Sequence, residues 1–503
     1  MPSNVAVRLR AQPEALVEGL ARIRAELELP ETFGPQVEQA AQEAVAAART
    51  RTASTPRSEL PFITIDPEGS MDLDQAMHLA RGEQGGYVVH YAIADVAAFV
   101  EPGGPIDAEA RHRGETLYGA EDRVPLHPPA LSEDGASLLP DEERPALVWR
   151  IALDGDGALT DVHVTRMRVR SVRRWSYAEA QQVLDASDGT GGATGNDTGD
   201  ATGEGTDAPE VLLLLREIGR LRQQIETDRG GISLPLPEQE VDEAPGGGFT
   251  LSFRDPLPSE DWNAQISLLT GIAAAELMLE AGIGLLRTLP PADPRDVARL
   301  RRVAAGLRIS WPEEWDYPQF VRSLDPHRPA HQAMTVACTR LLRGSGYTAF
   351  DVPGGDPAPA QPLHAAIAAP YAHVTAPLRR LGDRFAGEIC VAICAGEPVP
   401  DWVREALPEL PGLLADSARR ASRYERAVVD LIETVTLQGR IGEEFAGVIT
   451  SVEEERPGRG VVLVSAIGVE ARVESASDLP LGAEVTVRLE SADLAERRVV
   501  FRR

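Results

Sequence analysis

The sequence predicts an α+β protein: a mixed-sheet core surrounded by helices, followed by a small C-terminal β-barrel. Three observations predict this class. Strand-type runs rich in Val, Ile and Tyr dominate residues 60–172, helical patterns dominate residues 211–438, and strand-type runs return in residues 441–503. Five short strands in about 60 residues are typical of an oligonucleotide-binding (OB) barrel.

The composition excludes several classes of enzyme. The chain has 503 residues with 50 Lys+Arg against 78 Asp+Glu, a formal net charge of −28, and every basic residue is an arginine. Without lysine there is no Schiff-base catalysis, no Walker-type phosphate loop and no kinase-type ATP lysine. The three cysteines, Cys338, Cys390 and Cys394, predict a reducing, cytoplasmic compartment rather than a disulfide framework. Cys390 and Cys394, four residues apart in an apolar helical stretch, favour buried core thiols over metal ligands.

Residues 1–57 are predicted to be a helical segment. Leucine and isoleucine recur at helical spacing from Leu16 to Leu27, and residues 37–48 form a second, alanine-rich stretch. The first ten residues contain no apolar signal region. The uncharged stretch 357–378 holds five prolines and two histidines, so we expect it not to span a membrane. We expect a monomer without membrane association.

The central segment, 58–438, begins with strands, among them residues 61–66 and 87–100. Alternation in residues 162–172 puts Arg166, Arg168 and Arg170 on one strand face, which suits either nucleic acid or ion pairs with acids. The sequence leaves both open. Residues 185–210 carry seven acids and no base among Gly and Thr, so they are predicted to be a disordered insertion.

A group of carboxylates follows the first of these strands, in FITIDPEGSMDLDQA. Asp66 ends the strand, a turn follows, and Asp72 and Asp74 share one face if their segment is extended. Converging carboxylates repel each other, and divalent cations with oxygen ligands, such as Mg²⁺, relieve that repulsion. The spacing does not match a calcium loop. Taken alone, the group also fits a solvated acidic turn.

Two further features point to nucleic acid. In YAHVTAPLRRLGD, Arg379 and Arg380 follow a proline-containing turn, where a guanidinium could hold a phosphate in two hydrogen bonds. Tyr118 and Tyr177 lie beside basic residues, an arrangement that suits stacking on unpaired bases. Core packing is the alternative for each aromatic side chain.

Together these motifs resemble the ribonuclease II family, the RNB catalytic domain of 3′→5′ exoribonucleases. The first family signature, I-D-x-x-x-[ST]-x-D-x-D-D-A, is matched by residues 65–76 except at Gln75. The second is matched by Tyr371, Thr375, Ala376, Pro377, Leu378, Arg379, Arg380 and Asp383. The resemblance covers about residues 62–435, and the family also carries a barrel after this domain.

The resemblance implies a processive exoribonuclease that hydrolyses single-stranded RNA to nucleoside 5′-monophosphates with Mg²⁺, or with Mn²⁺. It implies catalytic roles for Asp74 and Arg379. The metal-site positions are Asp66, Asp72, Asp74 and Gln75. The RNA-binding positions are Tyr118, Tyr177, Arg379, Arg380, Gln265 and Glu425. The implied domains are 1–57, 58–438 and 441–503.

The sequence departs from the family at several places. Gln75 replaces an aspartate, Gln265 a glutamate and Gly271 an asparagine, and residues 232–240 lack the expected phenylalanine. A short helical N-terminus stands in place of cold-shock domains. These departures favour one alternative hypothesis: a catalytically impaired RNA-binding protein with the RNB fold.

Overall fold

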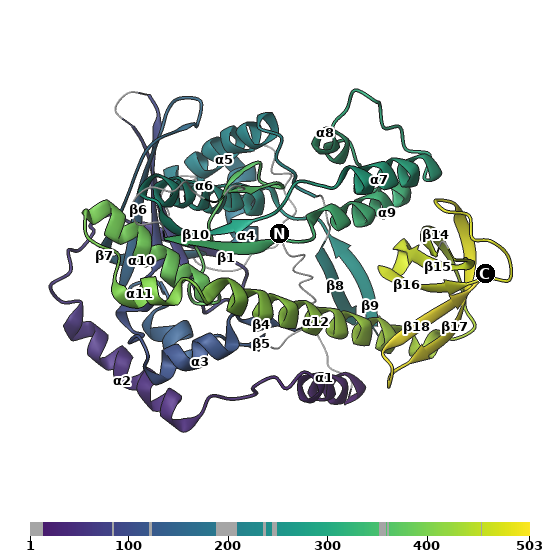
Figure 1. The fold of residues 1–503 in the computed structure, drawn as a ribbon, viewed down its shortest axis with the longest axis horizontal. Coiled ribbons are helices and arrows are strands. Elements are labelled where there is room, and N and C mark those ends of the chain that lie inside the picture. Colours follow the sequence, from purple (N-terminus) through teal and green to yellow (C-terminus); the bar gives the residue numbers. More distant parts are fainter. Residues whose placement is uncertain are drawn as a thin grey trace.

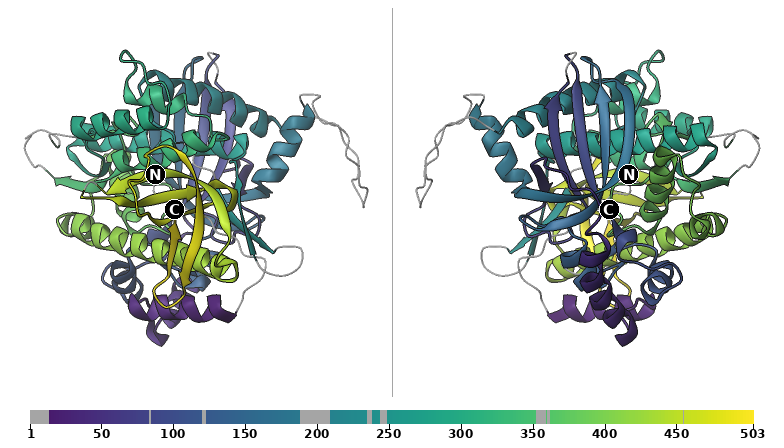
Figure 2. Two further views of the ribbon diagram at one scale, coloured as in Figure 1. Left: turned by 90° about the vertical axis from the view of Figure 1, so that its right-hand side faces the viewer. Right: turned by 90° about the vertical axis from the view of Figure 1, so that its left-hand side faces the viewer.

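The strand-type runs of the central segment form the predicted mixed sheet, which closes into a five-stranded barrel. Its strands are β1 (Phe62–Asp66), β2 (Gln75–Arg81), β3 (Tyr87–Ala94), β6 (Glu143–Leu153) and β7 (Leu159–Ser176). They pair in the order β1-β2-β3-β6-β7, and a parallel pairing of β1 with β7 closes the barrel. The second view in Figure 2 shows these strands side by side. Tyr91 and Trp149 are fully buried in its core.

The structure is a computed structural model that describes residues 14–503 except 83–84, 120–122, 188–208, 235–237, 244–248, 352–358, 360–361 and 454. Most of the predicted insertion 185–210 therefore lies outside the described residues. Its first three residues continue helix α4 (Tyr177–Ser187), and Glu210 begins α5 (Glu210–Asp228).

Two expectations about the first barrel are refined. The predicted strand 87–100 ends at Ala94, because the chain turns at the buried Asp95 into a 3₁₀ turn, η1 (Val96–Ala98). The arginine face of β7 is paired with acids. Arg166 contacts Asp95 and Glu388, Arg168 contacts Glu143, and Arg170 contacts Asp141. This strand face is therefore an ion-paired surface of the barrel.

Helices and short hairpins surround the barrel (Figure 1). The flanking helices are α3 (Pro105–Arg113), α4, α5, α6 (Pro258–Ala281), α10 (Leu381–Ala395) and α11 (Asp401–Ala406). The small strands and turns are β4 (Leu117–Tyr118), β5 (Arg123–Val124), η2 (Ala130–Gly135), β8 (Glu238–Glu243), β9 (Phe249–Arg254), β12 (Leu363–His364) and β13 (Ala369–Pro370). Helix α6 is long and apolar enough to cross a membrane, but 56% of its apolar window is buried inside the protein, as in a core helix.

The paired strands β10 (Ile283–Thr288) and β11 (Gly346–Asp351) pack on the same body, because Leu285, Leu286 and Phe350 belong to the core cluster of the first barrel. A separate group of helices packs against Val448 and Leu463 of the C-terminal barrel. It consists of α7 (Pro294–Gly306), α8 (Tyr317–Arg322), α9 (Pro329–Cys338) and η3 (Thr339–Leu342). Cys338 and Cys390 are buried, and Cys394 is half-buried in α10. The thiols thus lie in or beside the core, as the sequence indicated.

The C-terminal residues form the predicted OB-like barrel. The barrel contains β14 (Glu444–Glu453), β15 (Arg456–Val464), η5 (Ser465–Ile467), β16 (Val469–Glu474), β17 (Glu484–Asp493) and β18 (Arg498–Arg502). The strand order β14-β15-β16-β18-β17 closes with one parallel pair, β16 with β18. Helix α12 (Leu410–Leu437) and η4 (Gln438–Arg440) join this barrel to the body around the first barrel (Figure 1).

The two N-terminal helices belong to two different cores. In α1 (Glu14–Glu26), Leu16, Leu20 and Ile23 share a buried cluster with Leu431 of α12 and with residues of the C-terminal barrel. In α2 (Pro35–Arg51), Ala41 and Ala48 share a cluster with Phe62, Leu73 and other residues around the first barrel. Residues 14–51 therefore attach both barrels to their surroundings, whereas the exact domain boundaries stay predictions.

The packing of α6 gives the first test. An added Cβ on Gly271 would lie 2.2 Å from Tyr371 Cε2 and 2.6 Å from the carbonyl oxygen of Ala372. We expect Gly271→Ala to lower the unfolding free energy by about 2–3 kcal/mol, measured by urea denaturation, because backbone must move. Gly412→Ala is the control, since nothing lies within 4 Å of its added Cβ. If Gly271→Ala had the same unfolding free energy as Gly412→Ala, the close approach of α6 to residues 371–372 would be contradicted.

Candidate active site

Asp74 joins the two sequence motifs. It lies in the segment between β1 and β2, where Leu73 is buried and its N–H donates to Ser137 Oγ at 3.0 Å. The Asp74 carboxylate is buried and accepts a hydrogen bond from Leu378 N at 2.8 Å. Its other oxygen lies 3.5 Å from Arg379 Nε. Burial raises the pKa of Asp74 to about 8, although the nearby Arg379 charge lowers it.

Asp66 and Asp72 lie in the same region as Asp74, because the Asp72 charge acts on both of the other carboxyl groups. Burial raises the pKa of Asp66 to about 7, the Arg379 charge opposes this, and the Asp72 charge adds to it. Asp72 also raises the pKa of Asp74. Asp72 itself forms an ion pair with Arg123, 2.8 Å between Oδ1 and Nη1. The Asp72 charge thus couples the three carboxylates. Each also lies near a guanidinium group: Arg379 for Asp66 and Asp74, and Arg123 for Asp72.

The turn that carries Arg379 is fixed from two sides. Arg380 binds Asp383 through Nε and Nη2, and Asp383 Oδ2 accepts a hydrogen bond from Ala376 N at 2.8 Å. On the other side, His127 Nδ1 lies 3.1 Å from the carbonyl oxygen of Leu378. Burial lowers the pKa of His127 to about 4, so the ring is neutral and donates this hydrogen bond. Leu378 N is thereby held toward Asp74.

Both polar atoms of the Gln75 side-chain amide form hydrogen bonds within the protein. Its Oε1 accepts a hydrogen bond from Tyr91 Oη at 2.7 Å, and its Nε2 donates to the carbonyl oxygen of Thr375 at 2.5 Å. Thr375 Oγ1 in turn lies 2.7 Å from Ser267 Oγ. The side chain ties β2 to the second motif. Its predicted metal contact stays a prediction.

The two predicted RNA-stacking tyrosines both lie at this site. Tyr177 begins α4, and its hydroxyl accepts a hydrogen bond from Asn263 Nδ2 at 2.9 Å. Burial raises the pKa of Tyr177, and the Asp66 charge raises it further. Tyr118 is 37% exposed on β4, and the charges of Arg379, Asp72 and Asp74 all act on its pKa, which burial raises to about 12.

The remaining predicted residues, Arg380, Gln265 and Glu425, are placed differently. Arg380 is committed to Asp383, so Arg379 is the guanidinium at Asp74. Gln265 is buried on α6 and donates to Glu226 Oε2 at 2.5 Å. Glu425 lies on α12, where burial and then the Glu115 charge raise its pKa to about 7. Their contacts to RNA stay predictions.

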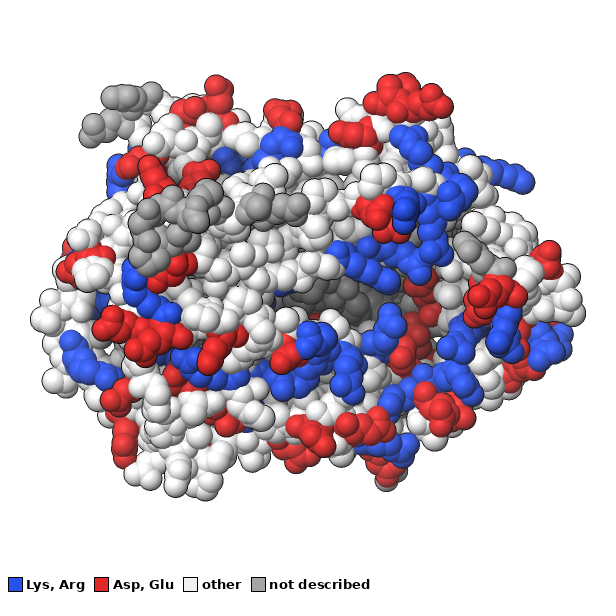
Figure 3. Space-filling model, viewed as in Figure 1, with Lys and Arg blue, Asp and Glu red and all other residues white. Residues whose placement is uncertain are grey.

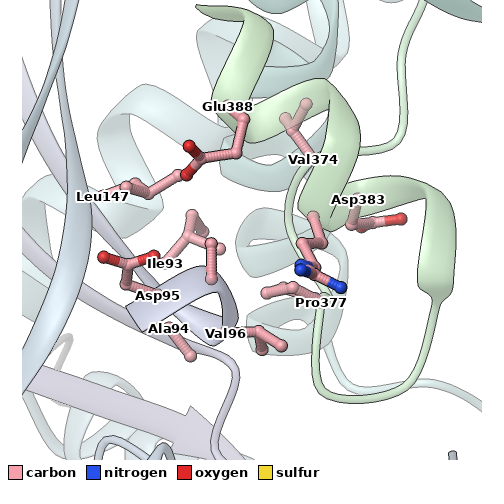
Figure 4. A pocket seen from close by; sticks show the side chains of 11 residues that line it. Ile93, Ala94, Asp95, Val96, Leu147, Val374, Pro377, Asp383 and Glu388 are labelled. Carbon is pink, nitrogen blue, oxygen red and sulfur yellow. The ribbon is translucent and has the colours of Figure 1, made fainter. Parts of the chain in front are cut away.

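A small pocket lies on the inner side of the second motif (Figure 4). Asp95 and Glu388 line it together with Pro377 and Asp383, and Figure 4 shows the carboxylates of Asp95 and Glu388 on the same side. Arg166 bridges these two carboxylates. Because its acids are already neutralised, this pocket supports the second motif rather than forming a ligand site.

A border of exposed arginines was missed from the sequence. Figure 3 shows a hollow flanked by basic side chains, over α7 and η3 on one side and over α12 on the other. Burial lowers the pKa of Arg340, and the charges of Arg299 and Arg343 lower it further. These three like charges therefore lie close together. The charges of Arg426 on α12 and of Arg340 both lower the pKa of Glu470 in the C-terminal barrel, whereas burial raises it. Arg426 and Arg340 therefore both lie near this glutamate. We call Arg299, Arg340, Arg343, Arg423 and Arg426 the arginine border.

The donors at Asp74 fit a divalent cation in their chemistry. Asp66, Asp72 and Asp74 supply hard oxygen atoms, and the two carboxyl groups with raised pKa values lack full charge compensation. Within the described part of the chain, however, no three His, Cys, Asp or Glu side chains are gathered closely enough to form a finished metal site. Asp66, Asp72 and Asp74 are thus the residues that would hold an ion.

The fold and the two motifs at this site are those of the RNB domain. A family model for the RNB domain matches residues 56–392, and a model for the RNase II-type exonuclease C-terminal S1 domain matches residues 443–503. The chain belongs to the RNB family.

Individual relatives agree with this assignment. Ribonuclease R of Escherichia coli is 25% identical over 482 residues, covering 88% of this chain and 56% of that protein. Ribonuclease R of Aquifex aeolicus is 26% identical over 412 residues, covering 79% and 54%. The chain therefore spans about half the length of these curated relatives.

Solved structures share the fold. Mycoplasma genitalium RNase R in complex with ribose-methylated single-stranded RNA matches with a TM-score of 0.83 and 19% identity, over 97% of this chain and 78% of that one. Yeast Ssd1, a pseudonuclease, matches with a TM-score of 0.63 and 16% identity, over 84% and 51%. The fold thus occurs in proteins with and without nuclease activity.

The raised pKa of Asp74 gives a test in the metal-free protein. A carboxyl group with a pKa of about 8 when folded, against an ordinary value of 3.8, stabilises the fold when protonated, and this contribution is lost as pH rises from about 4 to 8. We expect Asp74→Asn to raise Tm by roughly 3 °C at pH 7.5 and by less than about 1 °C at pH 4. The exposed Glu405→Gln serves as control. A pH-independent effect would show that Asp74 is not desolvated.

Proposed function

We propose that the chain is a hydrolytic 3′→5′ exoribonuclease that degrades single-stranded RNA processively to nucleoside 5′-monophosphates. The observation that carries the proposal is the junction at Asp74, where a buried carboxylate meets Leu378 N and Arg379 from the other motif. Membership of the RNB family supports it, as do relatives named ribonuclease R. We also propose a cytoplasmic location, because the cysteines are free thiols. We further propose that the chain is a monomer.

The proposed reaction uses the side chains as the geometry arranges them. Arg379 touches Asp74 at a single long contact and is partly exposed, so it can also donate to a phosphate oxygen and stabilise charge that develops there. The half-buried ring of Tyr177 can stack on the 3′-terminal base beside Asp66, and Tyr118 can stack on a base farther along. A divalent cation held by Asp66, Asp72 and Asp74, in our proposal Mg²⁺ or Mn²⁺, would supply Lewis-acid stabilisation and activate water.

Helix α12 gives the RNA a route away from the site. Near the start of α12, the hydroxyl of Ser417 donates a hydrogen bond to Glu115 Oε1 at 3.0 Å. Glu115 precedes by two residues the strand β4, which carries Tyr118. Nine residues after Ser417, Arg426 lies near Glu470 of the C-terminal barrel. The exposed arginines between these points can contact successive phosphates. We propose that single-stranded RNA follows α12 along the arginine border.

One assay separates enzyme from binder. We expect the wild-type chain with Mg²⁺ or Mn²⁺ to release 5′-monophosphates from an RNA with a single-stranded 3′ end, read by gel electrophoresis and chromatography. Asp74→Asn should lower the rate at least about 1,000-fold, with RNA affinity within a few-fold, because the variant removes a carboxylate that would hold the divalent cation at the reacting phosphate. Glu405→Gln is the neutral control. A shifted but intact wild-type RNA would instead identify an RNA-binding protein without turnover.

The arginine border is tested by salt dependence. We expect the double variant Arg423→Gln/Arg426→Gln to weaken RNA binding about tenfold at 0.1 M salt and to lower the slope of log affinity against log salt by about 1.4, as expected for two lost single-strand phosphate contacts. Arg502→Gln, which removes an arginine paired with Glu490 on the barrel, is the matched control. An unchanged slope would exclude α12 from the RNA path.

A further inference from the structure

The positive charge of Arg123 lies between the two carboxylates of Asp72 and Glu133, whose mutual repulsion it offsets. Arg123 lies on β5, directly opposite Tyr118 of β4, and its guanidinium bridges two acids. Nη1 lies 2.8 Å from Asp72 Oδ1, and Nη2 lies 2.5 Å from Glu133 Oε1. Asp72 is one of the three carboxylates expected to hold divalent ions, so this contact engages a metal-site residue with a side chain of the protein itself.

The bridge is well anchored. Asp72 is 16% exposed, and Arg123 is 30% exposed. The neighbouring Val124 and Leu126 are buried, and Leu126 N donates to Thr116 Oγ1 at 3.0 Å. A half-buried guanidinium that is held between two carboxylates loses both charge-assisted hydrogen bonds if it leaves. Arg123 is therefore a fixed part of the site.

The charge of the site fits a single divalent ion. The coupled groups are the four carboxylates of Asp66, Asp72, Asp74 and Glu133 and the three guanidinium groups of Arg123, Arg174 and Arg379. When all are ionised, the net charge is −1; Gln75 is neutral, and Asp383 is balanced by Arg380. One divalent cation and one phosphodiester group bring the total to zero. A second divalent cation would leave an excess of two positive charges.

We propose that Arg123 is the permanent counter-ion of Asp72 and that this centre consequently takes one divalent cation rather than two. The inference rests on the proposed metal-dependent function and specifies its metal content. It assigns Arg123 a positioning role, because the guanidinium acts through Asp72 and not on the RNA. Gln75, whose amide is occupied by Tyr91 and Thr375, adds no charge that would attract a second ion.

The test counts Mn²⁺ ions by electron paramagnetic resonance during titration of the intact, RNA-free chain. We expect one Mn²⁺ per wild-type chain and two per Arg123→Gln chain, because the substitution frees Asp72 and makes the site one charge more negative. Arg123→Lys, which keeps the charge, should bind one. Arg168→Gln is the control: it also removes an arginine from a partly exposed ion pair, here with Glu143 instead of Asp72. This variant should bind one Mn²⁺.

Two ions on the wild-type chain, or one ion on Arg123→Gln, would overturn the inference. If Arg123→Gln does not fold, as judged by circular dichroism, Arg123→Met replaces it with the same expected count of two. Failure of the proposed function looks different: the wild-type chain would leave RNA uncut whatever its Mn²⁺ count. A wild-type chain that binds no Mn²⁺ would overturn the inference and the metal dependence together.

Discussion

The site depends on a buried carboxylate that two distant parts of the chain must neutralise together. Asp74 follows the first strand of the barrel, whereas Leu378 and Arg379 precede α10, and their contacts bring the two segments into one place. Burying a charge is costly unless hydrogen bonds and opposite charges compensate it. Much of the surrounding structure provides that compensation: His127 orients Leu378, Asp383 fixes the turn, and Gln75 ties Thr375 to β2.

The arginine-only composition takes on a structural meaning here. Arginine stays charged when buried and can bridge two acids at once, as Arg166 does between Asp95 and Glu388 and Arg123 between Asp72 and Glu133. Although the net charge is −28, exposed arginines lie along α7, η3 and α12 on one face, and this local positive charge supports the proposed RNA path. The local potential decides binding, and the total charge does not.

The sequence predicts the elements and motifs of this protein well and their partners poorly. The C-terminal barrel, the N-terminal helices and the adjacency of Asp66, Asp72 and Asp74 follow from periodicity and spacing. Closure of the first barrel needs the long-range pairing of β1 with β7, which no local pattern encodes. The partners of Gln75 lie far away in the sequence, and Arg123 sits in a two-residue strand without periodicity. The arginine border combines separate elements that only the fold brings together.

Helix α12 also has a mechanical consequence. Its 28 residues run as one element from the site to the C-terminal barrel, and α1 packs against it and against that barrel. A helix advances about 1.5 Å and turns about 100° per residue. Lengthening α12 by one residue would therefore swing the barrel around the helix axis far more than it would push it outward. An insertion of about one whole turn would instead keep the orientation of the barrel, so the length of α12 sets the orientation of the two barrels relative to each other.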